Sequence, residues 1–217
     1  MARSILILGE SGAGKTTSLR TLSPETTFIF DSDKKGENWR GWKKDYNTQN
    51  KNYIATSDAN IIFTMLKRMN DGDLKHIKVA VIDTLNGVMI DDEFKRMREK
   101  SFDKWQDLAA SIYRLISDIH DLREDLTVVC IAHTQTDRDD NGYFFTHMKT
   151  SGRKLEKIVP ESKFTVVLLA KGDNGKYVFE TSANHSTAKA PMGMFDSKEI
   201  PNDMKVVVDT MIAYDEG

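Results

Sequence analysis

The chain has 217 residues, of which 29% are charged and 39% hydrophobic; this is the composition of a globular protein, long enough for one large α/β domain. Its formal net charge of −2 excludes a global attraction to nucleic acid or anionic membrane, so any polyanion site must be a local patch. The single cysteine, Cys130, excludes a disulfide framework and fits a reducing cytoplasm, and no apolar run reaches the ~18 residues of a membrane span.

The first predicted element is a strand over Ser4–Leu8, and a complete G-x-x-x-x-G-K-T phosphate-binding loop follows it at Gly9–Thr16. A helix is predicted to begin at Lys15, so strand, glycine-rich turn and helix stand in the order that this motif requires. Lys15 can reach the β- and γ-phosphates of a nucleotide, and the Thr16 hydroxyl can ligate Mg²⁺. The predicted nucleotide-binding residues are Gly9, Glu10, Ser11, Gly12, Ala13, Gly14, Lys15, Thr16 and Thr17.

Two acids follow the second predicted strand, Thr27–Phe30. If the strand continues through Asp31 and Asp33, their side chains point to opposite faces, and one of them can face the γ-phosphate and polarise a water. The alternative is that both are solvated loop acids, with Asp31 capping the turn.

The segment Lys34–Tyr53 is polar and shows no helix or strand pattern. It interleaves Trp39 and Trp42 with cations, an arrangement that suits base stacking; the alternative is a surface loop whose tryptophans pack against the body. Asp58 is predicted to cap the helix that follows.

The third predicted strand, Val79–Ile82, ends in Asp83, which is the Walker B pattern. A carboxylate there can hold the Mg²⁺ water shell opposite Thr16. The next residue is Thr84 rather than a second acid, so the water-activating base is expected elsewhere. A helix is predicted from Asp103 to about Leu122.

The strand predicted over Leu126–Ala132 runs into His133 and Gln135, and polar residues at such a strand end lie where α/β sheets bind ligands. Gln135 can sense the γ-phosphate and relay its state to the following loop, predicted over Gln135–Ser162; His133 can do the same or simply cap the strand. A basic part of that loop is either a grip on a nucleic-acid backbone or a solvated charged face. Its candidate DNA contacts are Lys149, Arg153, Lys154 and Lys157.

The last third predicts an antiparallel hairpin of Phe164–Ala170 and Lys176–Thr181, followed by a helix from about Asn202 to Tyr214. The other strands are short apolar runs without alternation, as expected of strands buried on both faces of a parallel sheet. The fold class expected is a three-layer α/β P-loop NTPase with a mostly parallel central sheet, in one domain spanning residues 1–217.

These elements together resemble the RecA-like core of P-loop ATPases, and more narrowly the phage-encoded RecA-like ATP-binding proteins of the single-strand-annealing group. The resemblance implies that Asp33 is the general base, although the family usually has Glu there. It implies that Gln135 is the polar switch and that about 136–157 is the DNA-binding loop. It also implies that Lys171 and Lys176, on the late strands, reach the nucleotide of a neighbouring subunit.

The resulting hypothesis is a cytoplasmic ATPase that uses ATP and Mg²⁺, binds single-stranded DNA and assists annealing or strand exchange. Only Met1–Leu8 precede Gly9, so a ring or a DNA-templated oligomer is expected rather than a filament linked by an N-terminal segment, and hydrolysis is expected to be slow until a neighbour supplies a cation. One alternative is a small-molecule phosphotransferase of the nucleotide-kinase kind, with Arg138 or Arg153 on a lid; another is a nucleotide-dependent switch with little turnover. Strand order separates the first two, because a strand between the P-loop strand and the Asp83 strand favours the RecA class and direct adjacency favours the kinase.

Overall fold

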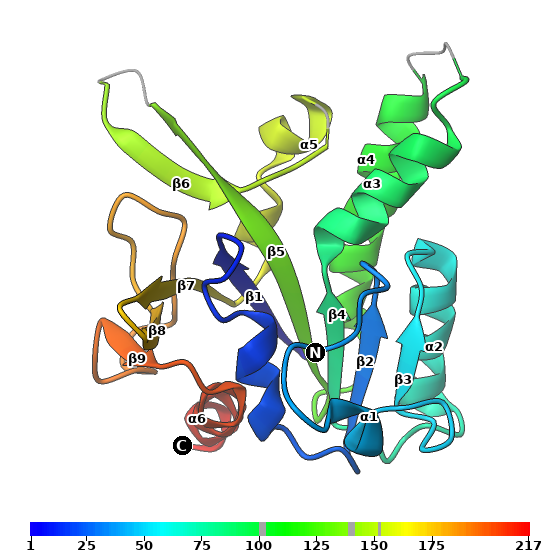
Figure 1. The fold of residues 1–217 in the computed structure, drawn as a ribbon, viewed down its shortest axis with the longest axis horizontal. Helices are drawn as coiled ribbons and strands as arrows, with labels where there is room; N and C mark the ends of the chain where they lie inside the picture. The colour runs from blue at the N-terminus through cyan, green and yellow to red at the C-terminus, as the bar shows by residue number, and fades with distance from the viewer. Residues whose placement is uncertain (100–102, 139–141, 152) are drawn as a thin grey trace.

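The computed structural model describes residues 1–99, 103–138, 142–151 and 153–217 (Figure 1). Within these residues the sheet has nine strands, in the order β3–β2–β4–β5–β1–β7–β8–β9, and β6 pairs with β5 outside this row. The strands are β1 (Arg3–Gly9), β2 (Thr27–Asp31), β3 (Tyr53–Ala55), β4 (Val79–Asp83), β5 (Thr127–Arg138), β6 (Phe144–Met148), β7 (Val166–Asp173), β8 (Lys176–Glu180) and β9 (Glu199–Pro201).

The helices connect these strands and flank the sheet (Figure 1). The α-helices are α1 (Trp42–Asp45), α2 (Ala59–Asp71), α3 (Leu85–Lys95), α4 (Asp103–Asp118), α5 (Arg153–Ile158) and α6 (Met204–Glu216). Short 3₁₀ helices are η1 (Thr16–Thr21), η2 (Ile119–Asp121) and η3 (Pro160–Lys163). Asp58 caps α2 as predicted, since its side chain accepts hydrogen bonds from the backbone N–H groups of Asn60 and Ile61.

In the row β3–β2–β4–β5–β1–β7 all neighbouring strands pair parallel, and the apolar runs of β1, β2, β4, β5 and β7 are buried on both faces, as predicted; β3, at the edge, is only partly buried. Alternate residues of each strand enter different cores because successive side chains of a strand point to opposite faces. On β1, Leu6 and Leu8 pack with α2, α3 and α4, whereas Ile5 and Ile7 pack with Leu19 of η1 and with α6. The result is a three-layer α/β fold of the expected class.

The far end of the sheet is antiparallel. β7 and β8 form the predicted hairpin across Asn174 and Gly175, both of which have positive φ, and β9 then pairs with β8. The predicted last helix is α6, which begins after Pro201 and is capped by the side chain of Asp203. This end of the chain packs α6 against η1, beside the P-loop.

One predicted loop is in fact a two-stranded arm. β5 does not end at Ala132 but continues to Arg138, and β6 pairs with it antiparallel, from Thr134 opposite Met148 to Arg138 opposite Phe144. The arm projects beyond the other parallel strands (Figure 1). The sequence did not predict this arm, because strands were recognised there by buried apolar runs. The outer half of the arm is solvent-exposed and carries polar and aromatic residues.

Other elements also differ from the sequence predictions. The helix after the P-loop begins at Thr16 rather than at Lys15 and is a short 3₁₀ helix that ends at Thr21, shortly before Pro24. The predicted segment Lys34–Tyr53 contains α1 and the start of β3, and α3 directly after Asp83 had no clear pattern in the sequence. Asp139, Asp140, Asn141 and Gly152 of the predicted loop lie outside the described residues.

Candidate functional site

The P-loop wraps around the side chain of Lys15. The Lys15 ammonium donates hydrogen bonds to the carbonyl oxygens of Gly9, at 2.7 Å, and Glu10, at 2.8 Å. Gly12 and Gly14 have φ values of 83° and 89°, which a residue with a Cβ adopts only with strain. Burial lowers the pKa of Lys15 to about 8, although the nearby Asp83 carboxylate raises it. The loop therefore holds, at the end of β1, a lysine whose pKa is lower than that of a free lysine.

A cavity of about 540 Å³ opens beside this lysine. It is lined by residues from the P-loop and η1, from the loop after β2, from the ends of β4 and β5, and from the β8–β9–α6 segment. These residues are Ser11, Gly12, Gly14, Lys15, Thr16, Thr17, Arg20, Lys35, Asn38, Thr84, His133, Tyr177, Pro201, Asn202 and Asp203. Six of the nine predicted nucleotide-binding residues, all but Gly9, Glu10 and Ala13, thus line a cavity large enough for a small-molecule ligand.

Thr16 and Asp83 meet as the Walker pattern predicts. The Thr16 hydroxyl donates a 2.6 Å hydrogen bond to Asp83 Oδ2, and Asp83 Oδ1 is buried without a hydrogen-bond partner. Burial raises the pKa of Asp83 to about 6, and the hydrogen bond from Thr16 opposes this shift. An unpaired buried carboxylate oxygen beside a hydroxyl fits Mg²⁺, a cation that takes one or two protein oxygens and completes its shell with water and phosphate.

No cluster of three or more His, Cys, Asp or Glu side chains with metal-ligand spacing occurs among the described residues. A fully protein-made metal cage is therefore not found in the described part of the chain, whereas a shared phosphate–metal site needs only the Thr16–Asp83 pair.

The two acids after β2 have different surroundings. Asp31 is buried, and its carboxylate accepts 2.7 Å hydrogen bonds from the Gly36 N–H and the Tyr53 hydroxyl. Asp33 accepts hydrogen bonds from the Thr84 hydroxyl at 3.2 Å and from the Lys35 ammonium at 2.6 Å. Thr84 and Lys35 both line the cavity, so Asp33 is the acid whose partners face it.

A third acid, Glu37, was not singled out by the sequence. It is buried, and one carboxylate oxygen has no hydrogen-bond partner. Burial, followed by the negative charges of Asp83 and Asp31, raises the pKa of Glu37 to about 8. Glu37 lies in the polar segment 34–53, and nothing in that pattern distinguishes a buried acid from a solvated one.

The contacts of Trp39 and Trp42 decide between the two interpretations of segment 34–53. Trp39 lies against Tyr46 with ring centroids 6.0 Å apart, and Trp42 lies 5.2 Å from Tyr53. Both tryptophans pack against the core that η1 and α6 also contact. They belong to the body, so this segment is not a projecting stacking surface.

His133 and Gln135, at the base of the arm, have different surroundings. His133 lines the cavity, and burial and then the charge of Lys15 lower its pKa. Gln135 lies two residues further along the arm and is not part of the cavity wall; its amide donates a 2.8 Å hydrogen bond to Asp137. The polar residue that the structure brings to the predicted nucleotide is therefore His133.

Asn86, at the start of α3, connects the arm to the end of β4. Its buried side-chain oxygen accepts a 2.7 Å hydrogen bond from the His133 N–H, and its side-chain nitrogen donates a 2.8 Å bond to the Lys149 carbonyl. One amide thus joins the outgoing and returning strands of the arm to the helix that follows Asp83. The sequence carried no signal for this residue.

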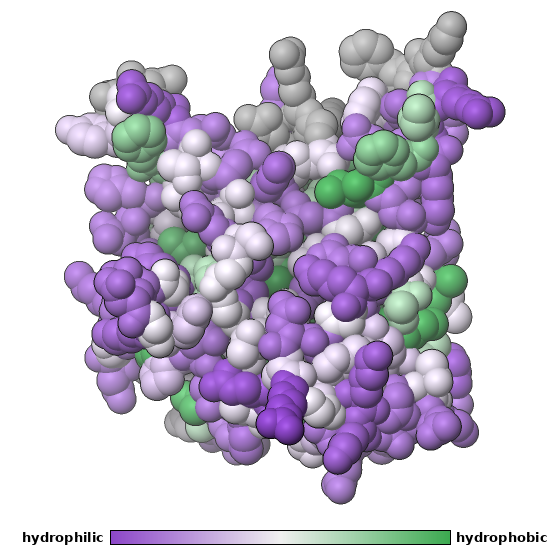
Figure 2. Space-filling model, in the orientation of Figure 1, coloured by the Kyte–Doolittle hydropathy of each residue, from purple (hydrophilic) through white to green (hydrophobic). Residues whose placement is uncertain are grey.

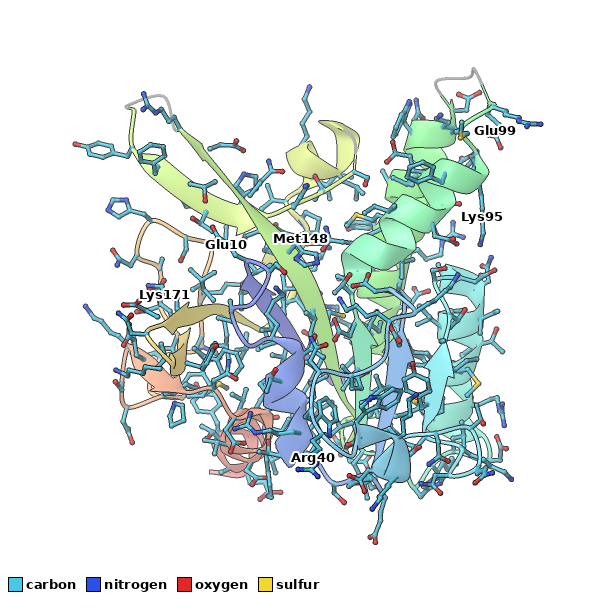
Figure 3. All side chains as sticks on the ribbon, in the orientation of Figure 1. Glu10, Arg40, Lys95, Glu99, Met148 and Lys171 are labelled. Atoms are coloured by element: carbon cyan, nitrogen blue, oxygen red, sulfur yellow. The ribbon has the colours of Figure 1, made fainter. Side chains whose placement is uncertain are left out.

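The basic residues predicted to contact DNA and those predicted to contact a neighbouring subunit lie in two different parts of the structure. Lys149 is exposed at the exit of β6 and Lys157 is exposed on α5; Arg153 and Lys154 lie on α5 as well, but their side chains are outside the described residues. Lys171 pairs with the buried Glu180 on the β7–β8 hairpin, and Figure 3 shows it on that side of the sheet. Lys176 is exposed at the start of β8.

The arm exposes aromatic side chains that the sequence analysis overlooked. Phe144 is 60% exposed, with the Arg138 guanidinium 4.9 Å from its ring centroid, and Phe145 is stacked near His147. Most of the face in Figure 2 is hydrophilic; one hydrophobic patch lies over the outer arm and another over the outer part of α3. The detectable signal was the run Tyr143–Phe145 in an otherwise polar segment.

Comparison with known proteins places these features in context. The model of the AAA domain family matches residues 1–191. A solved structure described as the crystal structure of the RadB recombinase is similar to this chain, with a TM-score of 0.47 and 11% identity, covering 82% of this chain and 80% of that chain. No curated protein matches the chain. Within the described part of the chain, no helix has the length and apolar character needed to cross a membrane.

Proposed function

The chain belongs to the AAA domain family, and from that premise we propose that it is an Mg²⁺-dependent ATPase that binds single-stranded DNA and assists annealing or strand exchange, in the manner of phage recombination proteins. Its fold is a RecA-like P-loop ATPase core, a fold that implies nucleotide binding. The nucleotide's use, the DNA partner and a cytoplasmic site of action are the proposed parts.

The observation that carries the proposal is the strand order. β5 lies between β1, which ends in the P-loop, and β4, which ends in Asp83. This inserted strand favours the RecA class over a nucleotide kinase. It also brings the arm, formed by the outer half of β5 together with β6, to the edge of the same cavity through His133.

The proposed roles follow from the contacts of each side chain. Lys15 binds the β- and γ-phosphates once its ammonium leaves the Gly9 and Glu10 carbonyls, and Thr16 and Asp83 hold the metal. Bound Mg²⁺ would neutralise charge on the phosphate oxygens. Asp33 orients the attacking water and accepts its proton; its carboxylate contacts Lys35 and Thr84, which line the cavity.

Single-stranded DNA is proposed to lie along the arm. The exposed Phe144 and Phe145 rings suit the stacking of unpaired bases, and Arg138 lies on one of these rings. Lys149 and Lys157, with Arg153 and Lys154 in the same stretch of chain, supply positive charge for the phosphates.

Nucleotide state is proposed to reach the DNA through the base of the arm. His133 lines the cavity, and its backbone N–H is held by Asn86, which also holds the Lys149 carbonyl. Gln135 remains a candidate switch in this path, acting from inside the arm. Self-association into a ring or a DNA-templated oligomer would bring Lys171 or Lys176 to a neighbour's nucleotide.

The deciding experiment measures ATP hydrolysis with and without single-stranded DNA. We expect a slow basal rate that DNA stimulates strongly, and both rates should disappear in Lys15→Ala, which removes the phosphate-binding cation. Lys67→Ala, which removes an exposed lysine on α2, is the matched control and should behave as wild type. Turnover only with a nucleoside or monophosphate acceptor would support the phosphotransferase instead, and tight ATP binding without turnover under any condition would support the switch.

A further inference from the structure

Part of the wall of the nucleotide cavity lies outside the P-loop. It consists of Tyr177 from β8, Pro201 from the end of β9, and Asn202 and Asp203 before α6, and it lies beside Gly14 of the P-loop. Pro201, Asn202 and Asp203 lie beyond residues 1–191, the part that matches the AAA domain family. The family match therefore says nothing about the ligand that this wall would contact.

Asn202 is the unusual residue of this wall. It lines the cavity, is only 7% exposed, and has a side-chain nitrogen that is buried without a hydrogen-bond partner. Leaving a buried amide donor unpaired costs about 1–3 kcal/mol, so such groups in a cavity wall commonly serve a ligand.

Tyr177 is held where its ring borders the same space. A Cβ atom built on Gly14 would lie 3.0 Å from Tyr177 Cδ1, and one built on Gly172 would lie 2.6 Å from Tyr177 Cε1. The ring therefore packs over two glycine backbones, one of them in the P-loop, and no larger residue fits beneath it. Since Tyr177 is still 48% exposed and lines the cavity, it offers an aromatic surface next to the phosphate-binding loop.

Hydrogen bonds connect this wall to η1, the 3₁₀ helix that follows the P-loop. The Thr21 hydroxyl on η1 donates a 2.8 Å hydrogen bond to Asp203 and accepts one from the Lys205 N–H, while Asp203 also caps α6. Asn202 is the residue next to this junction, and a Cβ atom built on Gly14 would lie 3.2 Å from its side-chain oxygen and 3.3 Å from its side-chain nitrogen. The distance from Lys15 to the Asn202 wall is thus set by packing that does not depend on a flexible loop.

We propose that this wall is the nucleobase subsite, in which Asn202 reads adenine and Tyr177 stacks on or against the base. The proposal rests on the proposed nucleotide-binding function and adds its base specificity. A triphosphate anchored at Lys15 leaves its nucleoside to occupy the rest of the cavity, and the wall formed by Tyr177 and Asn202 has an unpaired amide nitrogen and an exposed aromatic ring.

Adenine is the base whose hydrogen-bonding edge matches a carboxamide. An amide side chain presents one donor and one acceptor, and adenine presents an acceptor, N7, beside a donor, the N6 amino group. Guanine presents two acceptors, N7 and O6, on the same edge, which suits arginine or lysine instead. Asn202 therefore favours ATP over GTP.

The test measures dissociation constants by calorimetry for Mg²⁺ complexes of ATP, GTP and tripolyphosphate. We expect Asn202→Ala to weaken ATP binding about tenfold and to bring the ATP and GTP affinities close together, while tripolyphosphate binding stays unchanged. Tyr177→Ala should weaken ATP and GTP alike by fivefold or more, and Tyr177→Phe should retain wild-type affinity because the ring remains. Asn60→Ala, which removes an exposed amide on α2, is the control.

Two results would overturn the subsite. One is an equal loss of ATP and tripolyphosphate affinity in Asn202→Ala, which would mean that Asn202 only supports the P-loop; the other is an unchanged ratio of ATP to GTP affinity. If wild-type protein binds neither ATP nor tripolyphosphate, the proposed function itself fails. Thermal unfolding of each variant checks that it folds. If Tyr177→Ala does not fold, Tyr177→Phe still tests whether the aromatic ring without its hydroxyl is enough for wild-type affinity.

Discussion

At Asp83, burial disfavours the ionised form of the carboxyl group. It is almost fully enclosed, one carboxylate oxygen has no partner, and its pKa is raised to about 6 by burial. A metal ion next to that oxygen would stabilise the ionised form. Metal affinity should therefore depend on pH through this group, with Lys15, Lys35, Asp31 and Asp33 as charges around it.

We predict that the Mg²⁺-dependent part of ATP affinity falls about tenfold between pH 7 and pH 5, because a protonated Asp83 cannot hold the metal shell and each pH unit below the pKa costs a factor of ten. Titrations with and without EDTA isolate the metal-dependent part. Asp83→Asn should lower affinity at pH 7 and remove this pH dependence; any dependence left in that variant belongs to other groups, such as the nucleotide phosphate. Equal pH profiles for the two proteins would contradict the assignment.

Glu37 makes a second residue-scale prediction, about stability rather than binding. Its pKa is about 8 in the folded protein, above the ordinary carboxyl value of 4.5, so the folded state retains a proton that the unfolded state releases. Its contribution to stability is complete below the unfolded pKa and is lost as pH rises through the folded pKa. Glu37→Gln, which has no charge to bury, should thus be more stable than wild type by about 4 kcal/mol at pH 8 and by only about 1 kcal/mol at pH 5.

Urea unfolding of the two proteins at several pH values between 5 and 8 measures this difference. A gap that does not change with pH would mean that Glu37 is ionised, or already paired, in the native state.

At the scale of elements, the arm formed by β5 and β6 links the nucleotide cavity to a solvent-exposed surface. Its base is clamped by Asn86 and its outer part carries exposed aromatic rings. Removing the rings and removing the clamp should therefore have different effects, one on DNA affinity and the other on the coupling of DNA to ATP.

Phe144→Ala is predicted to weaken binding of single-stranded DNA by about 1–3 kcal/mol, since that is the usual cost of losing one stacked base contact. ATP affinity should not change, because Phe144 lies outside the cavity wall. Phe94→Ala removes another exposed phenylalanine, on α3, and is the matched control. Fluorescence anisotropy with a labelled oligonucleotide measures the effect; a similar loss in both variants would point to nonspecific binding.

Asn86→Ala is predicted to reduce the stimulation of ATP hydrolysis by DNA more than it reduces DNA binding. Two buried hydrogen bonds at the base of the arm are lost, so stability should also fall by roughly 1–3 kcal/mol. The ratio of stimulated to basal rate, measured at saturating DNA, separates coupling from affinity. An unchanged ratio would place the relay elsewhere, with Gln135 as the next residue to test.

At the scale of the whole molecule, one continuous sheet runs from β3 to β9, and its two hydrophobic cores lie on opposite faces of the same strands. The cavity draws its walls from both halves of the chain, from the P-loop near the start to Asp203 before the last helix. We therefore expect the parts to fold, and the site to assemble, in one event.

The single domain expected over residues 1–217 should consequently unfold in one cooperative transition, with equal calorimetric and van't Hoff enthalpies. Mg²⁺ and ATP at about 100 times the dissociation constant should stabilise the whole chain by about 2.7 kcal/mol and raise that single transition temperature. Lys15→Ala should lose the shift. Two separate transitions, only one of them sensitive to nucleotide, would show that the chain contains independent units.

Much of this site was predictable where neighbours in space are also neighbours in sequence. The P-loop, the capping aspartate Asp58 and the hairpin turn at Asn174 and Gly175 depend on local backbone geometry, and the fully apolar strands depend on burial of both faces. The arm escaped prediction because solvent-exposed strands lack the apolar runs that mark buried ones. Glu37, Asn86 and Asn202 escaped because a polar residue in a loop has the same local pattern whether it is solvated or buried.

The sequence by itself therefore determined the phosphate-binding loop, the Asp83 carboxylate at a strand end and the α/β class, since each of these follows from residue spacing and side-chain chemistry along a short stretch of chain. Only the tertiary structure decided that β5 separates β1 from β4, that Asp33 rather than Asp31 has partners facing the cavity, and that Tyr177 and Asn202 form part of the cavity wall. Those features depend on contacts between segments far apart in the chain and on the desolvation that such contacts impose, and neither is encoded in any local pattern.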